Sequence, residues 1–75
     1  MNDKELYALA AEAEKLAQET NAKLDDRDYI FRGYSATQLV VQLREVGERC
    51  HAAGLRAAAR RLEQMARDVQ QRTEK

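Results

Sequence analysis

The stretch CHAAGL, from Cys50 to Leu55, decides how the second half of this 75-residue chain folds. The segments on both sides of it are rich in Ala, Leu, Glu, Arg and Gln, which favour helix, and the chain contains no Pro. A Gly followed by an apolar residue is typical of a helix C-cap. On one continuous helix, the apolar stripe of residues 55–69 would also be rotated by about 100° from that of residues 36–50. The pattern therefore predicts a helical hairpin around Gly54, with a single kinked helix as the alternative.

Capping patterns mark where the first two helices begin. Asn2 followed by Glu5 matches a capping box, and so does Ser35 followed by Gln38. Tyr34 precedes the second cap, where we expect it to pack against the following helix as a hydrophobic staple. The predicted helices cover residues 3–23, 36–53 and 55–72, which makes the chain an all-α protein.

The large apolar residues of these helices recur at spacings of three and four, so each helix has one apolar face. The resulting core is thin, because 13 residues are Ala and a chain of this length buries only about 60% of its extended surface. We therefore expect a homodimeric helical bundle, in which a second copy supplies further buried surface. The residues predicted to lie in the core or at the dimer contact are Leu6, Leu9, Leu16, Leu39, Leu43, Val46, Cys50, Leu62, Met65 and Val69.

The composition favours a single cytoplasmic domain that spans residues 1–75. The one Cys excludes an internal disulfide, which fits a reducing compartment. No apolar run approaches the ~20 residues of a membrane span, and the start MNDKELYALA lacks the features of a signal peptide. We expect no membrane association, and we expect residues 70–75 to fray at the end of the last helix.

The net charge is zero, but acidic and basic side chains are unevenly distributed. Residues 1–28 carry eight acidic and four basic side chains, a net charge of −4. Residues 55–75 carry six basic and three acidic side chains, a net charge of +3. The first and last helices should therefore attract each other, within one chain or between two copies. The alternative interpretation is two solvated helix faces of different composition.

Three of the four aromatic residues lie in a connector, residues 25–34, which reads DDRDYIFRGY. In the structural interpretation, Phe31 or Tyr29 closes one end of an alanine-rich bundle, which is the default role of aromatic residues in small cores. In the functional interpretation, the aromatic residues and Arg32 form an exposed anchor for a partner protein. Both interpretations hold if Phe31 and Ile30 point inward and Tyr29 points outward.

No catalytic or metal-binding arrangement is visible in the sequence. Cys50 and His51 are the only Cys and the only His, and neighbours on a helix point about 100° apart, so they do not form a nucleophile pair. Further metal ligands at a matching spacing are missing, as are phosphate-binding and hydrolase motifs. We expect neither enzymatic activity nor a cofactor.

Arg56, Arg60 and Arg67 share one face of the last predicted helix, where they could meet an acidic protein or nucleic-acid phosphates. The stretch CHAAGL resembles the turn of a helix-turn-helix. That template, however, needs apolar residues where this chain has Arg49, Arg60 and Glu63. The absence of a net positive charge is a second argument against nucleic acid.

By elimination, we expect a small non-enzymatic interaction protein that acts as an adaptor, regulator or inhibitor. It would dock on a larger protein through the connector aromatics and the basic helix face. Two alternatives stay open: a nucleic-acid-binding regulator that uses the third helix, and a purely structural oligomerisation module. The residues predicted to bind the partner are Tyr29, Phe31, Arg32, Arg56, Arg60 and Arg67.

Overall fold

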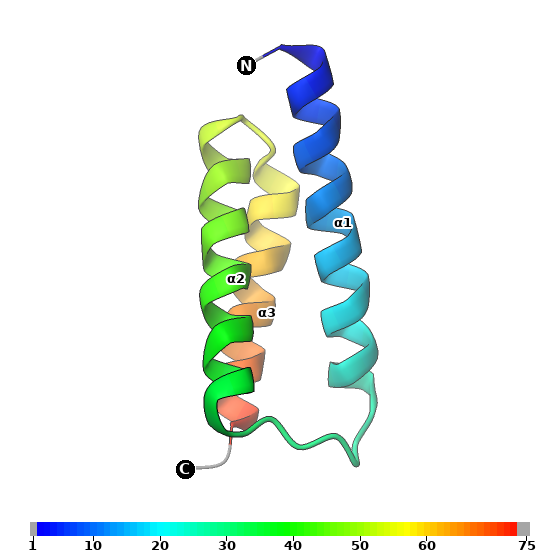
Figure 1. Ribbon diagram of the computed structural model, residues 1–75, viewed down its shortest axis with the longest axis vertical. Helices are drawn as coiled ribbons and strands as arrows, with labels where there is room; N and C mark the ends of the chain where they lie inside the picture. Colours follow the sequence, from blue (N-terminus) through cyan, green and yellow to red (C-terminus); the bar gives the residue numbers. More distant parts are fainter. Residues whose placement is uncertain (1, 74–75) are drawn as a thin grey trace.

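A computed structural model describes residues 2–73, and in that range the chain forms a bundle of three α-helices (Figure 1). The helices are α1 (Asp3–Asp25), α2 (Gly33–Ala52) and α3 (Arg56–Arg72). The predicted all-α class and all three predicted helices are confirmed, and the ends that differ do so by one to three residues. α2 and α3 run antiparallel side by side, and α1 lies along both of them (Figure 1).

The turn between α2 and α3 is the hairpin predicted around Gly54. Gly54 has a φ of 83°, the left-handed conformation that glycine adopts without steric cost. Its N–H donates to the carbonyl oxygen of His51 at 3.1 Å, and the N–H of Leu55 donates to that of Cys50 at 2.8 Å. The two bonds form a Schellman motif, which gives partners to carbonyls that the end of α2 leaves unpaired. The chain reverses direction here, so the alternative of one kinked helix is wrong (Figure 1).

The start of α1 follows the predicted capping pattern. The N–H of Glu5 donates to Oδ1 of Asn2 at 2.8 Å. With 23 residues, α1 is longer than α2 or α3, and its first turn extends past the hairpin turn (Figure 1). Leu6, which lies near this overhanging end, is only half-buried.

The core lies between the three helices and contains most of the residues predicted for it. Leu6 and Leu39 are half-buried, whereas the other eight predicted core residues are buried. Alanines supply much of the remaining core, so close approach of the helices replaces large interdigitating side chains. The buried hydrophobic residues are Leu9, Ala13, Leu16, Ala17, Phe31, Ala36, Val40, Leu43, Val46, Cys50, Ala59, Leu62, Met65, Ala66 and Val69.

The start of α2 differs from the prediction. The helix begins at Gly33, and Ser35 lies exposed in its first turn instead of capping it. The N-cap is Arg32, whose side chain makes no capping hydrogen bond. Tyr34 is 79% exposed, so the predicted hydrophobic staple is also wrong. The helix begins at Gly33 because of tertiary packing. The buried side chain of Phe31 holds the backbone just before Gly33, and a φ of 65° at Gly33 directs the backbone into the helix.

Thr20 is a fully buried polar residue of α1, and its hydroxyl oxygen has no hydrogen-bond partner within residues 2–73. In mutational data, burying an unpaired hydroxyl costs about 1–3 kcal/mol. We therefore expect Thr20→Val, which keeps the β-branched shape, to raise the free energy of unfolding by about 1 kcal/mol. The melting temperature, followed by circular dichroism, should rise by about 4–8 °C.

Thr37→Val on α2 is the matched control for this substitution. The side chain of Thr37 is exposed, and its Oγ1 donates to the carbonyl oxygen of Gly33 at 3.3 Å, so its replacement should not stabilise the protein. A Thr20→Val protein that melts at or below the wild-type temperature contradicts the prediction.

Candidate protein-interaction surfaces

The connector between α1 and α2, residues 26–32, lies across one end of the bundle (Figure 1). Phe31 is 2% exposed, and its ring meets that of Tyr29 edge-to-face, with 4.9 Å between centroids and an interplanar angle of 66°. The guanidinium carbon of Arg72 lies 5.2 Å from the centroid of the Phe31 ring, which is within cation–π range. Phe31 therefore closes the end of the bundle, as the structural interpretation predicts, and its ring is not part of the surface.

The other apolar residues of the connector lie at the surface. Tyr29 is 37% exposed, with Nζ of Lys23 5.6 Å from its ring centroid. Ile30 is 54% exposed, so the combined interpretation holds for Phe31 and Tyr29 but not for Ile30. Adjacent residues of an extended segment point to opposite sides, and Phe31 takes the inward position. Of the predicted connector site, Tyr29 and Arg32 are exposed, whereas Phe31 is buried.

Arg72, which the sequence analysis did not single out, holds the connector in place. Its guanidinium donates to three carbonyl oxygens, those of Leu24, of Asp26 at 3.1 Å and of Tyr29 at 3.4 Å. The last carbonyls of a helix lack partners within that helix, so a side chain of α3 caps the end of α1 from outside. In the sequence, the only sign of this role is that Arg72 is a basic residue in the last turn of its helix. That position does not show that its partners are the carbonyl oxygens of residues 43–48 positions earlier in the chain.

α3 ends at Arg72, the residue at which the predicted helix 55–72 also ends. Beyond it, Thr73 forms an isolated bridge with Phe31. Oγ1 of Thr73 donates to the carbonyl oxygen of Val69 at 2.6 Å. These contacts join residues 70–73 to the bundle; the expected fraying of residues 70–75 stays a prediction, and residues 74 and 75 lie outside the described residues.

Four arginines of α2 and α3 are engaged by groups of the same chain. Two of these contacts are ion pairs that join α1 to the hairpin, and both are exposed, so each contributes about 0–1 kcal/mol. Arg44 donates to Gln70 at 2.8 Å, Arg49 pairs with Glu12 at 3.1 Å, Arg61 pairs with Glu14 at 3.1 Å, and Arg72 donates to the connector carbonyls.

The three arginines predicted to bind a partner differ from these four. Arg56, Arg60 and Arg67 are exposed, and none forms a hydrogen bond or an ion pair with any residue of the described range 2–73. Their spacing along α3 places them on one face of the helix. Within the described part of the chain, none of the five N–H donors of each guanidinium is taken by a side chain or a carbonyl.

This arginine face borders α2 and forms one surface with it, which we call the α2–α3 face. Where the two helices meet, a charged hollow of about 300 Å³ is lined by Arg67 and Glu63 of α3 and by Arg44 and Glu48 of α2. Arg44 also lines a neighbouring hollow of about 410 Å³, nearer the connector, whose walls are largely apolar. The other residues of this second hollow are Ala36, Thr37, Val40, Val41, Gln70 and Thr73. The α2–α3 face is therefore apolar toward the connector and charged toward the hairpin turn.

The structure does not bring the predicted partner-binding residues into a single site. Tyr29 lies at the connector end of the bundle, whereas Arg56 begins α3 at the hairpin end. The 17 residues of α3 extend about 25 Å between these ends. The sequence could not show this separation, because it depends on the antiparallel packing of α2 and α3.

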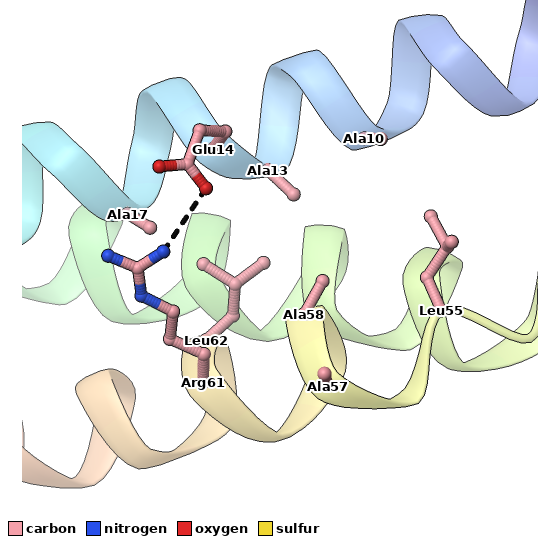
Figure 2. Close-up of a pocket in the computed structure, with 9 residues that line it drawn as sticks. All are labelled: Ala10, Ala13, Glu14, Ala17, Leu55, Ala57, Ala58, Arg61 and Leu62. Carbon is pink, nitrogen blue, oxygen red and sulfur yellow. Dashed lines mark hydrogen bonds and ion pairs between the residues drawn. The ribbon is translucent and has the colours of Figure 1, made fainter.

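A second groove, which the sequence analysis missed, lies between α1 and α3 (Figure 2). We call it the α1–α3 groove; its first hollow, of about 300 Å³, has the Glu14–Arg61 ion pair at one end. An adjoining hollow of about 400 Å³ shares Ala10 and Leu55 with the first one. The groove stays open because most facing side chains are alanines, which reach only to Cβ. Its apolar lining consists of Leu6, Tyr7, Ala10, Ala13, Ala17, Leu55, Ala57, Ala58 and Leu62.

Cys50 and His51 have different environments. Cys50 is completely buried in the core, and burial raises the pKa of its thiol above the ordinary value, although the charge of Arg49 acts in the opposite direction. The protonated thiol is a poor nucleophile, so Cys50 acts as a small apolar core residue. His51 is exposed. Within residues 2–73, no three His, Cys, Asp or Glu side chains lie close enough to hold a metal ion.

The chain is thus a three-helix bundle whose surface carries one basic, partly apolar face and one apolar groove. No described helix combines the length and the apolarity that a bilayer crossing requires. No protein-family model matches the chain, and neither a curated protein nor a solved structure matches it.

Proposed function

We propose that this chain is a non-enzymatic interaction protein that docks on a larger protein through the α2–α3 face. In this proposal the partner presents an acidic, amphipathic segment, and the chain acts as an adaptor, regulator or inhibitor by occupying that segment. The observation that carries the proposal is the contrast between four arginines engaged within the chain and three exposed arginines without a partner in residues 2–73.

The charge pattern of the face supports an acidic protein as the partner. Arg56, Arg60 and Arg67 offer planar guanidinium groups that bind carboxylates in a bidentate way. Glu48 and Glu63 line the same hollow as Arg67. Two carboxylates in this position repel a continuous row of phosphates, whereas a protein segment can place its own Lys or amide groups beside them.

The apolar end of the face supports an amphipathic rather than a purely acidic partner. Val41 is 42% exposed and lines the larger hollow, and Tyr34, about two helical turns before it on α2, is 79% exposed. Apolar and aromatic anchors at such a position supply most of the affinity in many interfaces. The arginines then orient the segment and accelerate its encounter.

A direct test uses two synthetic helical peptides, one with Leu on one face and Glu on the other, and one in which Lys replaces every Glu. We expect the protein to bind the Glu peptide and not the Lys peptide. A variant with Arg56, Arg60 and Arg67 all changed to Glu should bind the Glu peptide at least about tenfold more weakly. Isothermal titration calorimetry measures the affinities, and circular dichroism verifies that the variant is folded.

The matched control changes Lys4, Lys15 and Arg27 to Glu, which alters the net charge equally but leaves the α2–α3 face intact. Its affinity for the Glu peptide should stay within about threefold of the wild type. Equal losses in both variants contradict the proposal, because they would reflect net charge alone. Binding of duplex DNA that weakens steeply with salt and depends on the three arginines would instead support the nucleic-acid alternative.

A further inference from the structure

We infer that the partner segment on the α2–α3 face is an α-helix aligned with α3, and that it carries one Lys or Arg among its acidic residues, opposite Glu48 and Glu63. This inference rests on the proposed function, and it specifies the conformation of the segment and the order of its charges. The charges along α3 do not form a uniformly basic row, so a tightly bound partner has to match their order.

One stripe of α3 carries these charges. Its charged residues follow one another at spacings of four, three and four residues, which places them on one side of the helix; they are Arg56, Arg60, Glu63 and Arg67. Gln70 continues the stripe and lines the apolar hollow. The helical rise places Glu63, Arg67 and Gln70 about 10, 16 and 21 Å from Arg56 along the axis. From the hairpin turn to the connector, the stripe is therefore basic, basic, acidic, basic and uncharged.

The acidic position of this stripe is reinforced from α2. The side chain of Glu63 lies over Gly47, since its Cγ is 3.7 Å from the point that a Cβ of residue 47 would occupy. Glu48 follows Gly47 directly and lines the same hollow as Glu63. Both side chains are exposed, and neither forms a hydrogen bond or an ion pair within residues 2–73, although Arg44 and Arg67 line the hollow too. A partner carboxylate at this point is repelled by two glutamates, whereas a partner Lys or Arg is attracted by both.

The spacing of the stripe favours a helix over an extended segment as the partner. A helix aligned with α3 has the same rise per residue, so positions 1, 5, 8, 12 and 15 of the partner meet the five positions of the stripe from one helix face. An extended segment advances about 3.3 Å per residue and would meet them with positions 1, 3, 4, 6 and 7. Successive side chains of an extended segment point to opposite sides, so it cannot direct all five toward α3. The matching helix has acidic side chains at positions 1, 5 and 12, a Lys or Arg at position 8 and an apolar residue at position 15.

The test compares two 15-residue peptides of identical composition and net charge, held helical by the same side-chain staple. The in-register peptide has Glu at positions 1, 5 and 12, Lys at position 8 and Leu at position 15. In the exchanged peptide, the Lys of position 8 and the Glu of position 12 change places. Position 8 is the midpoint, so it faces Glu48 and Glu63 whichever way the peptide lies along α3. We expect isothermal titration calorimetry to show that the in-register peptide binds at least about tenfold more tightly.

Two variants of the full chain assign this preference to the glutamates. Glu48→Gln/Glu63→Gln removes both carboxylates at nearly constant size, and it should bind the two peptides within about twofold of each other. The matched control is Glu5→Gln/Glu19→Gln, which removes two exposed carboxylates from α1 and should keep the tenfold preference. Circular dichroism verifies that both variants are folded.

The outcomes separate this inference from the proposed function. Equal binding of the two peptides by the wild type, lost in the variant with three arginines changed to Glu, overturns the inference and leaves the proposed function standing. Binding of neither peptide by the wild type overturns both. A preference that persists in Glu48→Gln/Glu63→Gln, or that the control also loses, overturns the inference because the two glutamates then do not select the central Lys.

Discussion

Phe31→Ala is expected to lower the free energy of unfolding by about 3–5 kcal/mol, the range seen when a buried phenylalanine is truncated. Phe31 is 2% exposed and is the one phenylalanine of the chain. Its removal leaves a cavity beneath Tyr29 and takes away the ring surface that Arg72 covers. Small domains have about 5–15 kcal/mol of total stability, so the variant should be partly unfolded at physiological temperature.

Urea denaturation followed by circular dichroism measures the loss. Phe31→Leu should recover most of the stability, because leucine restores most of the lost apolar volume. The matched control is Tyr34→Ala, an exposed aromatic residue three positions away, whose effect should stay within about 0.5 kcal/mol. Equal effects of Phe31→Ala and Tyr34→Ala would show that the connector does not close the core.

Arg72→Ala is expected to lower the free energy of unfolding by about 1–2 kcal/mol. Hydrogen bonds from a charged donor contribute about 1.5–3 kcal/mol, and the solvent exposure of this guanidinium places the expected loss toward the low end. The substitution leaves the carbonyl oxygens of Leu24, Asp26 and Tyr29 without this donor. It also loosens the connector, because Arg72 is the side chain of α3 that bridges α1 and Phe31.

Hydrogen exchange gives the local signature of this loss. The amides of Asp28 and Tyr29, which are bonded to groups of Asp26, should exchange faster in Arg72→Ala. Arg60→Ala is the control, since Arg60 lies on the same helix without a partner in the described residues and should change neither stability nor exchange. Arg72→Lys should fall in between, because a lysine keeps the charge but not the fork that reaches several carbonyls. Unchanged amide exchange in Arg72→Ala would contradict the role assigned to this residue.

The contrast between Phe31 and Ile30 shows where sequence reasoning about the connector ends. Composition places three aromatic residues together, and small-core logic predicts that at least one is buried. Which of two adjacent apolar residues points inward depends on the path of the chain from α1 to α2. The two possible registers differ by one residue, and no local pattern distinguishes them.

The candidate surfaces show the same limit. Helical spacing places Arg56, Arg60 and Arg67 on one face, and all three lie within α3. Spacing does not reveal that Arg61, directly after Arg60, is paired with Glu14 across 47 residues. Nor does it reveal the α1–α3 groove, which exists only because two alanine-rich faces from distant segments meet.

The sequence by itself determined the helices, the hairpin and the apolar face of each helix. These features depend on short-range interactions: Asn2 caps an N–H three residues on, Gly54 relieves strain at one position, and residues three or four apart share a helix face. Only the tertiary structure decided the orientation of Phe31, the capping of α1 by Arg72 and the separation of the two surfaces. Those contacts join residues more than 40 positions apart, and they exist only once the helices have docked at one angle and register.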